Sequence, residues 1–160
     1  MKKFRVGNGY DVHRLAEGLQ LTLGGVKIEH DKGCVAHSDG DAVIHALCDA
    51  LLGAAALGDI GKHFPDTSDE FKGIDSRILL RRTASLLRQK GWQIGNVDCT
   101  IVLQRPKVAP YIEQMRQEMA NAMEIDTDEV AVKATTTEKL GFTGREEGVA
   151  AYAVALIFHD

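Results

Sequence analysis

The sequence has 160 residues, of which 44% are hydrophobic and 26% are charged, and its net charge is −4. This length and composition predict one soluble domain over residues 1–160, and the negative charge argues against nucleic acid as a partner. No apolar run is long enough for a signal peptide or a membrane span, and three widely spaced cysteines predict no disulfide framework, so we expect a cytoplasmic protein.

In the first half of the chain, apolar periodicity predicts two strand segments and one helix. Residues 4–10 predict an opening strand, and residues 19–28 predict a hairpin with a glycine turn. The S-x-x-D pattern at Ser38 predicts the start of a helix, which apolar residues at helical spacing extend to Ala54. Glycines within residues 58–61 predict that this helix gives way to a loop.

In the second half, helical periodicity predicts helices at 76–90 and 110–123, and alternation predicts strands at 97–103 and 130–134. The last strand, at 149–158, is apolar on nearly every residue. Such a strand requires cover on both sides, which favours burial against another subunit. Because helices and strands mix without strict βαβ alternation, we expect an α+β fold, a mixed β-sheet covered on one face by about three helices.

The spacing of Asp11, His13 and His45 predicts a metal site. Asp11 and His13 lie two residues apart at a strand end, so both side chains project to one face. His45, on the first helix, is the best third ligand, and three nitrogen and oxygen ligands leave a fourth position open, as in catalytic zinc sites. Asp49 lies one turn further and can orient the His45 ring. The alternative is a chance pair with His45 on a helix surface.

Two further stretches have groups suited to phosphate. His37 and Ser38 precede the first helix, whose N-terminus favours an anion, although Ser38 can be a simple N-cap. Three threonines at 135–137 end a strand beside Glu138. Hydroxyls suit phosphate oxygens and a carboxylate suits a hard cation. The alternative is β-favouring threonines on a strand surface.

Together these stretches resemble the 2-C-methyl-D-erythritol 2,4-cyclodiphosphate synthase family. The similarity runs essentially end to end, and the joint presence of its motifs in this order is highly specific. The matching segments are G-Y-D-V-H from Gly9, A-H-S-D-G-D from Ala36, H-A-L-C-D-A-L-L-G-A-A-A-L-G-D-I-G-K from His45, F-P-D-T from Phe64, Q-R-P-K from Gln104, and V-K-A-T-T-T-E-K-L-G-F-T-G-R from Val132.

The resemblance implies a phosphorus–oxygen lyase of the non-mevalonate isoprenoid pathway. The substrate would be 4-diphosphocytidyl-2-C-methyl-D-erythritol 2-phosphate, whose 2-phosphate attacks the β-phosphorus and expels CMP to leave the cyclic diphosphate. Catalysis would then consist of positioning and charge neutralisation. The family is homotrimeric, with sheets packed around a threefold axis and active sites between subunits.

The resemblance also implies a role for each matching residue. Asp11, His13 and His45 would hold a divalent ion, usually zinc. A second ion, Mg²⁺ or Mn²⁺, would bind Glu138 and the substrate diphosphate, while His37 and Thr136 would stabilise the transition state. The expected contacts to the methylerythritol phosphate are Val12, Ser38, Asp59, Ile60, Gly61, Phe64, Pro65, Asp66, Thr67 and Ser68. The expected contacts to the cytidine diphosphate, from a neighbouring subunit, are Leu103, Gln104, Arg105, Pro106, Lys107, Val108, Ala109, Thr135 and Thr137, and Phe142 and Arg145 would lie near the threefold axis.

Two other functional classes stay open at this point. A zinc-dependent nucleotide phosphohydrolase would use the same metal to activate water, but it requires a general base, and no H-E-x-x-H signature provides one. A non-catalytic trimer that binds an isoprenoid diphosphate would function without His13 or His45.

Overall fold

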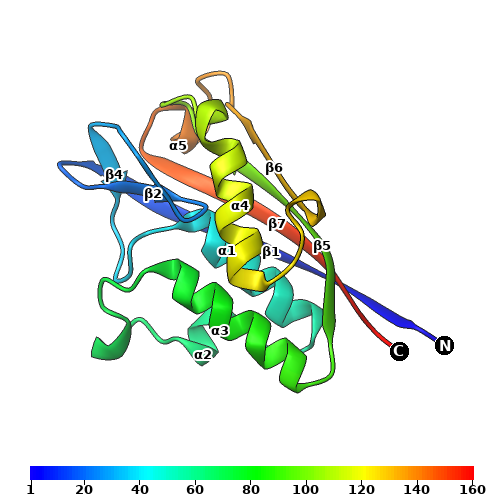
Figure 1. Ribbon diagram of the computed structural model, residues 1–160. Coiled ribbons are helices and arrows are strands. Elements are labelled where there is room, and N and C mark those ends of the chain that lie inside the picture. The colour runs from blue at the N-terminus through cyan, green and yellow to red at the C-terminus, as the bar shows by residue number, and fades with distance from the viewer.

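A computed structural model describes residues 1–160 and has a five-stranded mixed sheet, in the order β4-β1-β7-β5-β6, at its centre (Figure 1). The long strands β1 (Lys3–Glu17) and β7 (Gly148–His159) pair antiparallel along most of their lengths. β5 (Gln93–Val102) is antiparallel to β7 and parallel to β6 (Val130–Thr135). The short β4 (Lys32–Cys34) pairs with the end of β1.

One face of this sheet is covered by three long helices, as expected for the α+β class (Figure 1). α1 (Ala42–Ala54) lies directly on β1 and β7, and α3 (Ser76–Gln89) packs against both α1 and α4 (Ile112–Met123). None of the helices is long and apolar enough to span a membrane. The shorter elements are the hairpin β2 (Leu21–Leu23) and β3 (Val26–Ile28), the single-turn helices α2 (Ile60–His63) and α5 (Gly141–Gly144), and 3-10 turns at Asp69–Phe71, Ala109–Tyr111 and Thr127–Glu129.

Two glycines of β1 allow α1 to approach the sheet closely. A Cβ atom added at Gly9 would lie 1.8 Å from the carbonyl oxygen of Ala46, and one added at Gly7 would lie 2.0 Å from that of Ala50. Any side chain at these positions would therefore push the helix away. Because His45 precedes Ala46, this close packing is what brings its imidazole to the strand.

The opposite face of the sheet presents large apolar side chains to solvent. Phe4, Val6 and Tyr10 of β1 are 58%, 67% and 48% exposed, and Tyr152 and Val154 of β7 are 50% and 47% exposed. The rings of Tyr10 and Tyr152, which are opposite each other in the strand register, have centroids 4.8 Å apart. β7 is thus apolar on both faces, as predicted, and the helices of its own chain cover only one of them.

The start of the first helix differs from the prediction. Asp41, not Ser38, is the N-cap of α1, and its Oδ1 accepts a hydrogen bond from the backbone N–H of Ile44 at 3.0 Å. The glycine before Asp41 has a φ of +76°, which lies outside the helical region. The same buried carboxylate also accepts the N–H groups of Gly24 and Gly25, at 2.9 and 2.7 Å, so it joins α1 to the β2–β3 hairpin.

The segment expected to be a loop at residues 58–61 contains a helix as well. α2 follows Asp59, whose side chain caps it by accepting the backbone N–H of Lys62 at 2.9 Å. The prediction missed this element because a single turn is too short to show helical periodicity. The predicted helices 76–90 and 110–123 are confirmed as α3 and as the Ala109–Tyr111 turn followed by α4.

Candidate metal centre and substrate cavity

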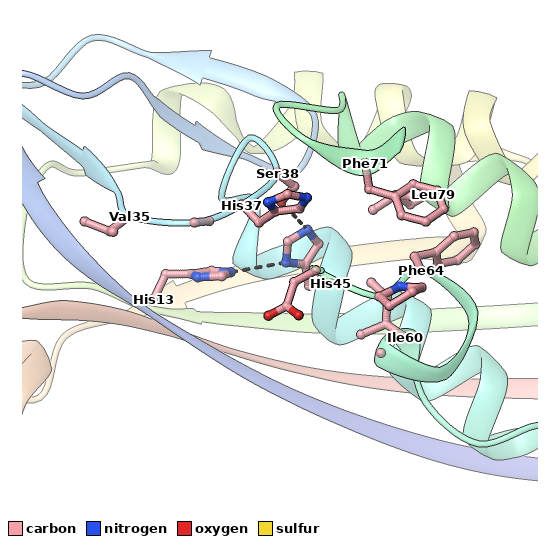
Figure 2. A pocket seen from close by; sticks show the side chains of 13 residues that line it. His13, Val35, His37, Ser38, His45, Ile60, Phe64, Phe71 and Leu79 are labelled. Atoms are coloured by element: carbon pink, nitrogen blue, oxygen red, sulfur yellow. Dashed lines mark hydrogen bonds between the residues drawn. The ribbon is translucent and has the colours of Figure 1, made fainter. Parts of the chain in front are cut away.

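The predicted triad comes together at the junction of β1 and α1. The Nε2 atom of His13 lies 2.9 Å from Oδ2 of Asp11 and 3.1 Å from Nδ1 of His45, and that Nδ1 lies 3.3 Å from the same carboxylate oxygen. Asp11 and His13 project from the helix-covered face of β1, as the two-residue strand period predicts. In Figure 2 a dashed line joins the rings of His13 and His45, which point toward each other.

The geometry of these atoms fits a divalent cation. Oδ2 of Asp11 is buried and has no hydrogen-bond partner of normal geometry, although two imidazole nitrogens lie within 3.3 Å of it. A buried carboxylate oxygen without a partner is costly unless another group compensates its charge. One carboxylate oxygen and two imidazole nitrogens are a ligand set that Zn²⁺ accepts. The three residues therefore form a candidate divalent-metal site.

The charges of the triad are also suited to a cation. Burial by itself would raise the pKa of Asp11, but the imidazoles of His13 and His45 lower it to about 2. For His45, burial lowers the pKa, yet the nearby carboxylates, first of all Asp11, raise it above its ordinary value. Asp11 is therefore an ionised ligand throughout the neutral range.

The second ring nitrogen of His45 contacts Ser38, which the sequence indicated as a substrate contact, and Ser76, which the sequence did not single out. Its Nε2 atom lies 2.9 Å from Oγ of Ser76 and 3.2 Å from Oγ of Ser38. The prediction that Asp49 orients this ring is wrong, because the Asp49 carboxylate accepts the backbone N–H of Ile60 at 2.7 Å and so fixes the start of α2.

A cavity of about 460 Å³ opens beside the triad (Figure 2). The expected site residues that line it are His13, His37, Ser38, His45, Ile60, Gly61, Phe64, Pro65 and Asp66. Four lining residues were missed: Val35, Ala36, Phe71 and Leu79. Apart from the position of Val35 and Ala36 beside His37, the sequence has no signal for them, since apolar wall residues resemble core residues.

The remaining residues expected at this cavity lie elsewhere. Val12 alternates with Asp11 along β1, so it projects to the uncovered face of the sheet and is 40% exposed. Asp59, Thr67 and Ser68 are not part of the cavity wall. The backbone of Ser68 nevertheless contacts the site, because its carbonyl oxygen accepts a hydrogen bond from Nε2 of His37 at 2.8 Å. His37 thereby ties the segment 64–68 to the rim.

The residues expected to contact the nucleotide form a separate cavity of about 250 Å³. β5 and β6 are parallel, so the segments that follow their carboxyl ends meet at one edge of the sheet. This cavity shares no lining residue with the first. Its lining residues are Leu103, Gln104, Pro106, Lys107, Val108, Ala109, Ala134, Thr135 and Thr136, of which only Ala134 was not predicted.

The other predicted residues of this region surround the second cavity without lining it. Nε of Arg105 donates to the Glu146 carboxylate at 2.8 Å, and the Thr137 hydroxyl donates to the carbonyl oxygen of Leu140 at 2.6 Å. Glu138 is exposed in the turn after β6 and does not belong to the triad cluster, and its N–H donates to Oγ1 of Thr136 at 3.2 Å.

The last two predicted residues lie near α5. Phe142 is 37% exposed, and its ring packs over Gly148, where an added Cβ would lie 3.1 Å from the ring. Arg145 forms an exposed ion pair with Glu147 at 3.2 Å.

The fold and the site together define a class: an α+β protein with a candidate three-ligand metal site of the kind that metalloenzymes use. The chain belongs to the YgbB family, which matches residues 4–158. It is 66% identical over 153 residues, 96% of this chain and 98% of the relative, to a protein of Azotobacter vinelandii named 2-C-methyl-D-erythritol 2,4-cyclodiphosphate synthase.

Two solved structures are similar over nearly the whole chain. The bifunctional IspDF of Campylobacter jejuni is 41% identical with a TM-score of 0.96; this chain is fully covered but spans only 43% of that longer protein. IspF of Plasmodium falciparum in complex with CDP is 36% identical with a TM-score of 0.84, over 96% of this chain and 95% of the other.

Proposed function

We propose that this chain converts 4-diphosphocytidyl-2-C-methyl-D-erythritol 2-phosphate to 2-C-methyl-D-erythritol 2,4-cyclodiphosphate and CMP. An oxygen of the 2-phosphate forms a new bond to the β-phosphorus of the same molecule. The bond from that phosphorus to the oxygen bridging the α-phosphate breaks, and CMP leaves with this oxygen. The names of the relatives support this reaction. In our proposal it is a phosphorus–oxygen lyase step of non-mevalonate isoprenoid biosynthesis in the cytoplasm.

The observation that carries the proposal is the convergence of Asp11, His13 and His45 at a cavity that His37 and Ser38 also line. These three residues would hold a divalent ion, in our proposal Zn²⁺, which would supply positive charge to phosphate oxygens at the reacting centre. Glu138 has the hard oxygen ligands that Mg²⁺ or Mn²⁺ prefers, and we assign it the second ion beside the diphosphate.

The other side chains would act by orientation and charge neutralisation. Ser38 has its hydroxyl on the cavity wall beside the triad, and His37 holds the segment 64–68 that closes one side of it. We assign His37 and Thr136 to donate hydrogen bonds to the phosphoryl group as charge develops in the transition state. No covalent intermediate is required, because the attacking and leaving groups belong to one substrate molecule.

We further propose that residues 1–160 act as one domain within a homotrimer whose active sites lie between subunits. The metal cavity and the nucleotide cavity share no lining residue within a chain, which supports an active site assembled from two protomers. The exposed apolar face around Tyr10, Tyr152 and Val154 offers a surface that a second and third copy would cover.

The reaction can be tested by phosphorus NMR of the protein incubated with the cytidyl substrate, with and without a metal chelator. The expected products are CMP and a cyclic diphosphate, and the chelator should stop their formation. CMP with a linear phosphorylated product would support a phosphohydrolase instead. Substrate that stays intact in the presence of added zinc and magnesium would overturn the proposal and favour a binding protein.

A further inference from the structure

We propose that Ser76 and Asp39 form a positioning pair that fixes the tautomer and the orientation of His45 at the metal centre. This inference rests on the metal site of the proposed function and extends it to a residue of α3, outside β1 and α1. Neither residue lines the substrate cavity, so both act on the site through His45.

Two hydrogen bonds join the buried Ser76 to Asp39, which is half-buried. Ser76 is the first residue of α3 and has no exposed surface. Its backbone N–H donates to Oδ2 of Asp39 at 2.9 Å, and its hydroxyl donates to Oδ1 of the same carboxylate at 2.5 Å. The backbone N–H of Asp41 also donates to that Oδ1, at 3.2 Å, so the carboxylate is held from both sides.

The number of available protons then determines the tautomer of His45. A serine hydroxyl has one hydrogen, and an ionised carboxylate can only accept. Because Ser76 gives its hydrogen to Asp39, its oxygen can interact with Nε2 of His45, 2.9 Å away, only by accepting a hydrogen bond. Nε2 must therefore have the proton, and Nδ1, the atom that faces Asp11 and His13, has the lone pair that a metal requires.

Ser38 is in a different position, although its Oγ lies 3.2 Å from the same Nε2 atom. Its oxygen accepts the backbone N–H of Gly40 at 3.3 Å, and no carboxylate takes its hydroxyl hydrogen. Ser38 lines the cavity, so this hydrogen is available to a phosphate oxygen. The two serines on one imidazole thus have separate tasks: Ser76 orients the ligand, and Ser38 faces the substrate.

The contact between His45, Ser76 and Asp39 is a variant of a common feature of metal sites. Ligating histidines usually donate their second N–H to a carboxylate or carbonyl, and loss of that partner typically lowers metal affinity about 10- to 100-fold. Here the serine hydroxyl lies between the imidazole and the carboxylate. The start of α3 therefore becomes part of the metal site, 31 positions along the chain from His45.

The test compares Ser76→Ala with Thr83→Val, a matched control on the same helix. Thr83 is also a buried hydroxyl, but it donates only to the carbonyl oxygen of Leu79, so its loss disturbs α3 without contacting the metal site. Zinc affinity is measured by competition with a chromophoric chelator. Ser76→Ala should bind zinc about 10- to 100-fold more weakly than the wild type, and Thr83→Val should match the wild type.

A second measurement detects the proton on Nε2 of His45 directly. In the zinc-loaded wild type, the Nε2 proton of His45 should give an exchange-protected imidazole N–H resonance in proton NMR. It should disappear or exchange faster in Ser76→Ala and persist in Thr83→Val. Asp39→Asn, which keeps the shape of the side chain but removes its charge, should weaken zinc binding severalfold and provides the test if Ser76→Ala does not fold.

The outcomes separate this inference from the proposed function. If the wild type binds no zinc, the proposed metal site itself is wrong. If the wild type binds zinc and both Ser76→Ala and Asp39→Asn match it in affinity and in the imidazole resonance, only the positioning pair is overturned.

Discussion

At the scale of single residues, the proposed metal site depends on three side chains directed to one point. Asp11 and His13 are directed by the strand period, and His45 is directed by its position on α1. We predict that His45→Ala loses the bound zinc and lowers turnover by roughly 10²- to 10⁴-fold, because several kcal/mol of charge stabilisation would be removed. Metal analysis of the purified variant beside the wild type, with a check of its circular dichroism, tests this. Full zinc content and an unchanged rate would rule out His45 as a ligand.

The pKa shifts of the triad predict how the metal-free protein responds to pH. The folded pKa of Asp11, about 2, is below the ordinary 3.8, so its stabilising effect is present above 3.8 and is lost as the pH falls toward 2. The raised pKa of His45 stabilises the fold below 6.5, and this effect is lost as the pH rises through the folded pKa. The cluster therefore contributes most between roughly pH 4 and 6.5.

Urea unfolding of the metal-free protein measures this contribution. Relative to Asp11→Asn, the wild type should gain on the order of 1–2 kcal/mol between pH 2 and pH 5, a value reduced for the partial exposure of the carboxylate. A difference between the two proteins that does not change with pH would contradict the assignment.

Residue spacing predicted the candidate metal-binding triad but not the contact of Ser76 with His45. The D-x-H pair and the helical position of His45 follow from strand and helix periods, which are local properties of the sequence. Ser76 reaches the site only because α3 packs against α1, and no local pattern indicates that contact. Asp49 lies one helical turn after His45 on α1, but its Oδ1 accepts a hydrogen bond from the backbone N–H of Ile60.

At the scale of elements, the distance between β1 and α1 determines whether the triad can form. We predict that Gly9→Ala destabilises the fold by about 2–3 kcal/mol and weakens zinc binding, since its Cβ would lie 1.8 Å from the carbonyl oxygen of Ala46. Urea unfolding and chelator competition measure the two effects. Gly53→Ala is the matched control on α1, because its nearest neighbour would be 4.0 Å away. Equal behaviour of the two variants would contradict the close-packing argument.

A second element-scale prediction concerns the buried cap of α1. Asp41→Ala would leave the N–H groups of Gly24, Gly25 and Ile44 without their acceptor. Each unsatisfied buried donor costs about 1–3 kcal/mol, so the free energy of unfolding should fall by roughly 3–5 kcal/mol. Chemical denaturation of the variant measures the loss. The exposed cap Asp59→Ala should cost less than about 1 kcal/mol, and a similar loss in both would contradict the role assigned to Asp41.

Periodicity predicted the long elements but missed the single-turn helices, whereas the glycine turn predicted the short β2–β3 hairpin. α3 and α4 have enough turns to show an apolar stripe, whereas α2 has a single turn. The start of α1 was placed at Ser38 because the S-x-x-D pattern is only a local signal. The buried carboxylate of Asp41 is selected instead by its contacts with the β2–β3 hairpin, which is distant in sequence.

At the scale of the whole molecule, the exposed apolar face of the sheet predicts that copies of this chain associate through it. We expect Val154→Glu to convert the proposed trimer to monomers, because a charge would be buried at the centre of an apolar interface. Analytical ultracentrifugation measures the change, with Ile78→Lys, an exposed position on α3, as the control. The monomer should keep its zinc, since all three ligands belong to one chain, but should lose turnover. A variant that stays assembled would contradict this role of the face.

The apolar pattern of the last strand predicted this surface from the sequence, because no residue of β7 from Val149 to Phe158 is charged. The number of subunits does not follow from that pattern or from a single chain. That number depends on how copies pack against each other. The proposed number, three, is what the resemblance to the family implies.

The central claim is that Asp11, His13 and His45 bind one divalent ion. The most direct test is anomalous X-ray diffraction at the zinc edge from crystals grown with zinc. We predict one strong zinc peak per protomer, about 2.0–2.2 Å from Oδ2 of Asp11, Nε2 of His13 and Nδ1 of His45. A peak held by other residues, or no peak at the triad, would contradict it.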